Sequence, residues 1–147
     1  MNDAQRLAET VVATMLANDA FSRWLGLKVL QVEPGRVSAE MTVRPEMLNG
    51  FGVCHGGVLF SFADSVLAFA SNTHGRLTVS IENNIAYPAK VLVGDRLHAV
   101  CEELSASRRI ANYQVVVTKD GGERVGLFRG TVYRTEKPII EGGLPAK

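Results

Sequence analysis

This sequence has few cysteines, no long uninterrupted apolar run and no excess of one charge. Each of these features excludes a class of protein. Two cysteines in 147 residues are too few for a disulfide framework, and unpaired thiols are typical of a reducing compartment, so we expect a cytoplasmic protein. The formal net charge of +1 shows no excess of basic residues of the kind that binds nucleic acid. The longest apolar run is too short and too interrupted to span a bilayer. We also expect no signal peptide, because no basic region precedes an apolar stretch near Met1.

Histidine is scarce as well. His55, His74 and His98 lack the spacing of metal ligands and the two cysteines add little, so we expect no metal site. The adjacent Cys54 and His55 suggest a thiol nucleophile beside its base. Neighbouring residues generally project in different directions, however, and no third residue is evident to orient the histidine. We therefore expect neither metal chemistry nor cysteine chemistry.

The length is that of one domain, which we place at residues 1–134. Residues 1–25 are expected to form an N-terminal helical segment within it. Asn2 or Asp3 can cap a helix, apolar residues follow on one face, and Gly26 is a stop signal. Residues 135–147 contain two Pro and two Gly, which predicts a flexible C-terminal tail.

Alternating apolar and polar residues predict an antiparallel sheet. Val37, Ala39, Met41 and Val43 alternate with polar side chains, which is the period of a strand with one wet face. Pro34-Gly35 just before them predicts a hairpin turn. The expected strands are 27–32, 36–43, 78–87, 96–105, 110–118 and 124–133. Five or six strands that share one long apolar helix predict an α+β fold, with a curved antiparallel sheet wrapped around that helix.

The helix is predicted within the stretch 49–72, which begins glycine-rich and polar and then becomes almost wholly apolar. Residues 58–71 contain no Pro or Gly and are rich in Ala, Leu and Phe, which favours a helix. Apolar residues on nearly all sides indicate that this helix is buried. Ser61, Asp64 and Ser65 interrupt it, and steps of three and four residues place them on one narrow stripe.

Asp64 and the glycines before it suggest acyl-group chemistry. A carboxylate in an apolar helix is costly unless it is paired, hydrogen-bonded or facing water, so Asp64 is either a structural residue bonded to a loop or a functional one. Gly56 and Gly57 carry unpaired N–H groups at the positive end of the helix dipole. A ligand atom can approach them closely, and such a helix end can hold an oxyanion. With Asn49 and His55 as flanking polar groups, the combination is typical of carbonyl activation.

This constellation resembles the hotdog-fold acyl-CoA thioesterases, and among them the phenylacetate-pathway (PaaI-type) subgroup. The resemblance is carried by Asn49-Gly-Phe-Gly-Val-Cys-His55-Gly56-Gly57, by Asp64 and by the stretch 79–89, and it covers nearly the whole chain except the last dozen residues. It implies the hotdog fold and hydrolysis of an acyl-CoA thioester with a phenylacetyl-like acyl group. It also implies sites built across a dimer interface, dimers that pair into tetramers, and no cofactor, since coenzyme A is part of the substrate.

The residues and the resemblance together assign roles. The Gly56 N–H would polarise the thioester carbonyl. Asp64 would attack directly, giving a mixed anhydride, or act as a general base on water. His55 and Asn49 would orient the carbonyl or the water. The expected substrate-binding residues are Gly57, Phe51, Phe60, Ser65, Ser80, Lys90, Arg108 and Arg109. The two phenylalanines would line an acyl pocket, a serine would position water, and the basic residues would bind the phosphates of coenzyme A.

Three other interpretations stay open. A hydratase or dehydratase of the same fold would act on the β-carbon with a histidine and a carboxylate, although adjacent glycines favour carbonyl activation. A non-catalytic acyl-CoA-binding module would keep the basic residues without needing Asp64. A purely structural oligomer would need neither.

Helix geometry adds an expectation about assembly. Asp64 follows Gly56 by eight residues, which is about 12 Å along a helix axis. An oxyanion donor and a carboxylate that act on one carbon must converge to within a few Å. We therefore expect the two residues of one site to come from different copies of the chain, related by a two-fold axis.

Overall fold

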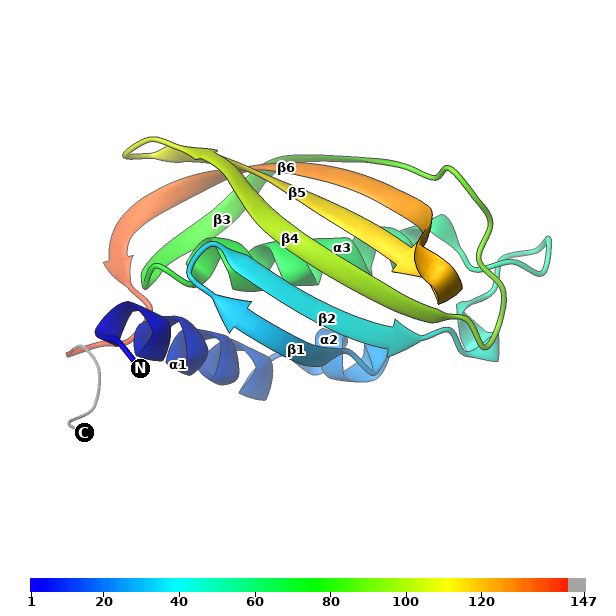
Figure 1. The fold of residues 1–147 in the computed structure, drawn as a ribbon, viewed down its shortest axis with the longest axis horizontal. Coiled ribbons are helices and arrows are strands. Elements are labelled where there is room, and N and C mark those ends of the chain that lie inside the picture. Colours follow the sequence, from blue (N-terminus) through cyan, green and yellow to red (C-terminus); the bar gives the residue numbers. More distant parts are fainter. Residues whose placement is uncertain (143–147) are drawn as a thin grey trace.

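Six strands form a single antiparallel sheet in the computed structural model, which describes residues 1–142 (Figure 1). The strands are β1 (Lys28–Glu33), β2 (Arg36–Thr42), β3 (Arg76–Ala86), β4 (Arg96–Ala106), β5 (Ile110–Lys119) and β6 (Glu123–Pro138). Their order across the sheet is β1-β2-β4-β5-β6-β3. The sheet curves around one long helix, so the predicted α+β fold is confirmed.

That helix, α3 (Gly56–Asn72), is the core of the molecule. Phe62, Leu67 and Phe69 are fully buried in it, as expected for a helix that is apolar on nearly all sides. The sequence predicted a helix over 58–71. The observed helix begins two residues earlier, because His55 caps the first turn and lets both glycines join the helix.

Two helices cover α3 beside the β1 end of the sheet (Figure 1). The N-terminal segment expected over 1–25 divides into α1 (Asp3–Ala17) and α2 (Ala20–Leu25). The Asn2 side chain accepts a hydrogen bond from the Gln5 N–H at 2.8 Å, and Gly26 ends α2 with a φ of 75°. Two short 3₁₀ turns, η1 (Pro45–Met47) and η2 (Asp120–Gly122), complete the described elements. No helix within residues 1–142 is long and apolar enough to cross a membrane.

β3 is an edge strand whose only described partner in the sheet is β6. Three of its apolar side chains, Leu77, Val79 and Ile81, are 41%, 46% and 57% exposed. Ser80 lies opposite Val132, and Asn83 lies opposite Gly130. Directly paired residues of an antiparallel sheet point to the same face, and Val132 is buried against the core. Ser80 therefore points toward the face that covers α3, although β3 leaves it exposed in the single chain.

The last strand is longer than the sequence predicted. The domain was expected to end at 134, but β6 continues to Pro138. The Thr135 hydroxyl donates to the Leu77 carbonyl at 2.6 Å, and the Arg76 guanidinium donates to the Thr135 carbonyl at 2.9 Å. These bonds hold residues that composition alone assigned to a loose tail. Residues 143–147 of the expected tail lie outside the described part of the chain.

Candidate active site

The first turn of α3 presents one unpaired N–H group. His55 Nδ1 accepts from the Gly57 N–H at 2.8 Å, and the His55 carbonyl accepts from the Val58 N–H at 2.9 Å. The N–H of Gly56 has no acceptor among residues 1–142. A neutral histidine that accepts at Nδ1 carries its proton on Nε2. The start of the helix thus offers the Gly56 N–H, at the positive end of the dipole, and a second donor on His55. Gly57, also predicted to bind substrate, gives its N–H to the cap.

Tyr87, which the sequence did not single out, lies over this turn. Its hydroxyl donates to the Gly56 carbonyl at 2.8 Å. A Cβ added at Gly56 would lie 3.0 Å from the Tyr87 ring and hydroxyl, so a side chain there would displace the ring. Gly56, Tyr87 and Lys90 line one surface cavity of about 440 Å³. The structure therefore brings Lys90 to the same cavity as the free N–H.

Asp64 lies two turns further along α3 and faces β3. Its Oδ1 accepts a hydrogen bond from Asn83 Nδ2 at 3.1 Å. Burial raises the pKa of the Asp64 carboxyl, and the Asn83 hydrogen bond partly opposes that rise. A carboxylate whose pKa is raised in this way is a stronger base than an exposed one.

The polar stripe predicted on α3 does not face one neighbour, because Asp64 faces β3 and Ser65 faces α2. The hydroxyls of Ser65, the residue after Asp64, and of Ser22 on α2 are hydrogen-bonded to each other at 2.9 Å, and Ser22 also bonds to Asp19. Successive helix residues lie about 100° apart around the axis, which turns Ser65 toward α2 while Asp64 faces β3. Ser80, the other serine predicted to position water, lies on β3 with Asn83. The structure therefore places Asn83 against Asp64 and turns Ser65 away from both, while Ser80 lies three residues before Asn83 on β3.

The loop before α3 is held by Asn49. Its side-chain oxygen accepts from the N–H groups of Phe51 at 2.9 Å and Val53 at 3.3 Å. This arrangement shapes the turn and leaves only the amide NH₂ for a substrate or water. Phe51 at the loop tip is 93% exposed. Phe60, by contrast, is half-buried and packs edge-on against Phe128, with ring centroids 5.2 Å apart.

Arg108 and Arg109 lie at the other end of α3. Arg76, four residues after the last residue of the helix, donates to the Arg108 carbonyl at 2.8 Å. Arg108 forms an ion pair with Glu136 at 2.7 Å, and Arg109 donates to the Tyr133 hydroxyl at 2.9 Å. In Figure 1 the turn between β4 and β5 is at the opposite end of the molecule from the start of α3. The arginine pair is thus not brought together with Gly56 of its own chain.

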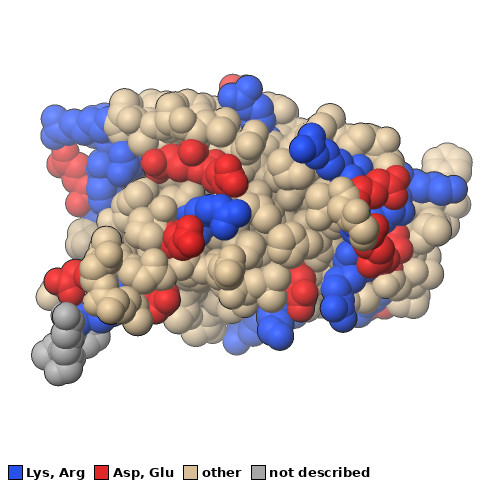
Figure 2. Space-filling view, in the orientation of Figure 1, with Lys and Arg blue, Asp and Glu red and all other residues tan. Residues whose placement is uncertain are grey.

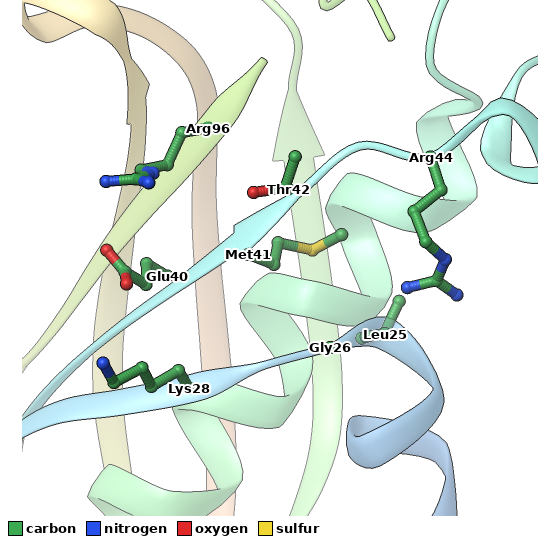
Figure 3. Close-up of a pocket in the computed structure, with 8 residues that line it drawn as sticks. All are labelled: Leu25, Gly26, Lys28, Glu40, Met41, Thr42, Arg44 and Arg96. Atoms are coloured by element: carbon green, nitrogen blue, oxygen red, sulfur yellow. The ribbon is translucent and has the colours of Figure 1, made fainter. Parts of the chain in front are cut away.

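A second hollow lies on the sheet beside α2 and is lined by three basic side chains (Figure 3). Arg44 is committed to the Trp24 carbonyl and to Glu46. Glu40 pairs in register with Lys28 and lies between it and Arg96, so the charges there are partly compensated. This balance is general: Figure 2 shows basic and acidic side chains interspersed over this face. No predicted site residue lines this hollow, which sets it apart from the chemistry at α3.

Two further features bear on the chemistry of the site: the state of the Cys54 thiol and the grouping of side chains that bind metals. Cys54 is buried, and burial together with the nearby negative charge of Asp95 raises the pKa of its thiol to about 11. A thiol in that state is protonated at neutral pH and is a poor nucleophile. Within residues 1–142 no three His, Cys, Asp or Glu side chains form a group that could hold a metal ion.

Comparison with known proteins gives a consistent result. Residues 51–125 match the thioesterase superfamily. The acyl-coenzyme A thioesterase PaaI of Escherichia coli K12 is 33% identical over 120 residues, which are 82% of this chain and 86% of the relative.

Solved structures agree with this match. The structure of E. coli PaaI superposes with a TM-score of 0.89 and 30% identity over 92% of this chain and 98% of that one. The TT0310 protein of Thermus thermophilus gives 0.77 and 42% identity over 80% and 98%. The protein smu.793 of Streptococcus mutans UA159, solved bound to acetyl CoA, gives 0.74 and 25% identity over 76% and 90%.

Proposed function

This chain belongs to the thioesterase superfamily, with the hotdog fold of the PaaI-type proteins, and is a thioester hydrolase; we propose that it hydrolyses acyl-CoA thioesters, with arylacetyl groups such as phenylacetyl preferred. The products are the free acid and coenzyme A. The observation that carries the proposal is the single unpaired N–H of Gly56 at the positive end of a buried helix. The names of the E. coli relative and of the acetyl-CoA-bound neighbour support the acyl-CoA part of it.

The reaction assigns distinct tasks to the two ends of the site. The Gly56 N–H and the helix dipole bind the thioester oxygen and stabilise its developing negative charge, with His55 Nε2 as a second donor. Asp64 attacks the carbonyl carbon or removes a proton from the attacking water. In both routes the carbon–sulfur bond breaks, the coenzyme A thiolate leaves, and one water is consumed. The reaction therefore needs no cofactor.

A site confined to one chain does not fit this division of tasks. Gly56 and Asp64 are both on α3 and eight residues apart, which corresponds to about 12 Å along the axis. Helical N–H groups point toward the start of the helix, so an oxygen held by Gly56 lies beyond the helix end and still further from Asp64. We infer that each site combines Gly56 of one subunit with Asp64 of its partner.

The edge strand β3 supplies a surface for that pairing. An eleven-residue edge with exposed Leu77, Val79 and Ile81 carries unpaired backbone groups and apolar side chains, a combination that favours pairing with another strand. If two β3 strands associate antiparallel across a two-fold axis, one self-complementary contact pairs their backbone groups and buries their apolar side chains. It also brings the Asp64 face of each subunit toward the α3 start of the other. The resemblance extends this to two dimers in a tetramer.

The shared site gives Arg108 and Arg109 a role. In antiparallel subunits the end of α3 in one chain lies toward the start of α3 in the other, so the arginine pair of the Asp64 subunit approaches the Gly56 of its partner. The phosphates of coenzyme A suit such a pair, and Lys90 joins from the Gly56 side.

Replacing both Arg108 and Arg109 by Ala is expected to raise the KM for acyl-CoA by roughly tenfold, with kcat within about twofold, because charge-assisted contacts to a remote phosphate stabilise substrate and transition state alike. Steady-state kinetics on acyl-CoA and on a short thioester without the nucleotide measure this. The short substrate should be unaffected, and Arg96→Ala in the hollow beside α2 serves as the matched control. Equal losses on both substrates would refute the assignment.

The function itself is tested by thiol release from a panel of acyl-CoAs. We expect turnover with the highest kcat/KM for phenylacetyl-CoA and its hydroxylated forms, compared with straight-chain acyl-CoAs of similar size. A parallel assay follows hydration of an enoyl-CoA. Hydration without thiol release would identify a hydratase, and tight binding without turnover would identify a binding module.

We also propose that the protein is located in the cytoplasm. Cys54 and Cys101 are both buried free thiols, and unpaired thiols fit a reducing compartment.

A further inference from the structure

Asn83 is the one described side chain that contacts the Asp64 carboxylate by a hydrogen bond. Its Nδ2 donates to Oδ1 at 3.1 Å. None of the described ion pairs involves Asp64, and Asp64 is the only charged residue of α3. Burial and Asn83 are the two causes that act on the pKa of Asp64, in opposite directions. No charged group of β3, β6 or the rest of α3 takes part.

The position of Asn83 is built by its surroundings. It lies on β3 opposite Gly130 of β6. A Cβ at position 130 would come within 2.7 Å of Asn83 Oδ1 and within 2.5 Å of Leu67 Cδ2. A side chain at position 130 would displace one or both of these side chains, so Gly130 leaves the Asn83 amide its place beside α3.

The Asn83 amide is also incompletely satisfied. Its Oδ1 is buried and has no hydrogen-bond partner among the described residues. A buried acceptor without a partner is unfavourable, and an apolar side chain of the same size would avoid that cost. The opposite orientation of the amide would direct its oxygen at a carboxylate. The observed orientation of the amide therefore leaves its oxygen unpaired, at some cost in stability, while its N–H donates to Asp64.

We infer that Asn83 is a positioning residue for the reaction: it fixes the orientation of the Asp64 carboxylate and favours its charged form, without touching the substrate. This inference rests on the role proposed for Asp64. It assigns to Asn83 a role that neither motif nor composition indicated.

The sign of the expected effect follows from the hydrogen bond. A donor favours the ionised carboxylate and lowers its pKa, so removal of the donor raises the pKa of Asp64 further above its ordinary value. Catalysis needs the ionised form. The acid limb of the pH–rate profile must then move to higher pH, and the rate must fall most at low pH and least on the alkaline plateau.

Asn83→Leu tests the inference, with Asn84→Leu as the matched control, because Asn84 is the next residue and lies opposite the exposed Arg129 on the outer face. In Asn83→Leu we expect the acid limb of kcat/KM to move to higher pH and the rate below it to drop by roughly tenfold. Thermal stability near neutral pH should change little, because the variant loses both an unpaired buried acceptor and the hydrogen bond to the ionised Asp64. Asn83→Ser, which restores a small donor, should recover part of the profile, and Asn84→Leu should leave it unchanged.

Direct titration separates this inference from the proposed function. NMR of carboxyl-labelled aspartate reports the Asp64 pKa in the unliganded protein whether or not the enzyme turns over a given thioester. A higher Asp64 pKa in Asn83→Leu than in the wild type supports the inference. An unchanged Asp64 titration, or a rate lowered equally at every pH, would overturn it and leave Asn83 as packing only. If Asn83→Leu does not fold, the same comparison is made with Asn83→Ser, whose weaker donor should give a smaller shift in the same direction.

Discussion

Asp64→Asn abolishes hydrolysis of acyl-CoA, with kcat lowered by about a thousandfold, while the variant folds and still binds acyl-CoA. The expectation follows from chemistry, because an amide nearly matches the shape of a carboxylate but is neither a useful base nor a nucleophile, and positioned proton transfer contributes about 10²- to 10⁴-fold. Folding should be retained. Burial opposes the charge of Asp64 in the wild type, and a neutral side chain removes that cost.

Three measurements make the result interpretable. Single-turnover kinetics give the chemical rate, calorimetric titration with a thioether analogue of the substrate gives affinity, and circular dichroism shows that the variant is folded. In the wild type the acid limb of the rate should lie above the ordinary range of an aspartate, since burial raises the pKa of Asp64. A folded variant that kept most of its rate would make Asp64 structural and the mechanism wrong.

The sequence predicted the framework because its signals are periodic and local. The alternation around Val37 to Val43 specified β2, and the apolar run specified α3, although both glycines were placed just before the predicted helix and not within it. The errors in element ends have local causes. The cap from His55 extends α3 backward, and hydrogen bonds between Thr135 and both Arg76 and Leu77 hold β6 beyond residue 134.

The contacts that refine the site were not predictable in the same way. Asn83 reaches Asp64 from 19 residues away, and Tyr87 reaches Gly56 from 31 residues away. Neither pair has a periodic pattern, because each depends on how β3 lies against α3. The irregular pairing between Ser80 and Glu82 on β3 also shifts which side chains face inward. A stripe on a helix shows which residues share a side, but not which neighbour each will meet, as the separation of Ser65 from Asp64 illustrates.

Hybrid dimers of Gly56→Val and Asp64→Asn chains are expected to regain activity although neither variant is active alone. The valine places a side chain against Tyr87, 3.0 Å from a Cβ at that position, and spoils the oxyanion donor. In a hybrid with shared sites, one site receives both lesions and the other combines an intact Gly56 with an intact Asp64. Random co-assembly should therefore restore roughly a quarter of wild-type activity, since about half of the dimers are mixed and each has one good site.

The most direct test of the shared site is the activity of hybrids purified through two different affinity tags, one on each variant chain. Both variants must first be shown to fold and to form dimers, and each homodimer serves as the inactive control. The account predicts that each purified hybrid has about half the activity of a wild-type dimer. If Gly56 and Asp64 of one chain served the same site, every site would carry one lesion, and verified hybrids as inactive as the parent variants would contradict the account.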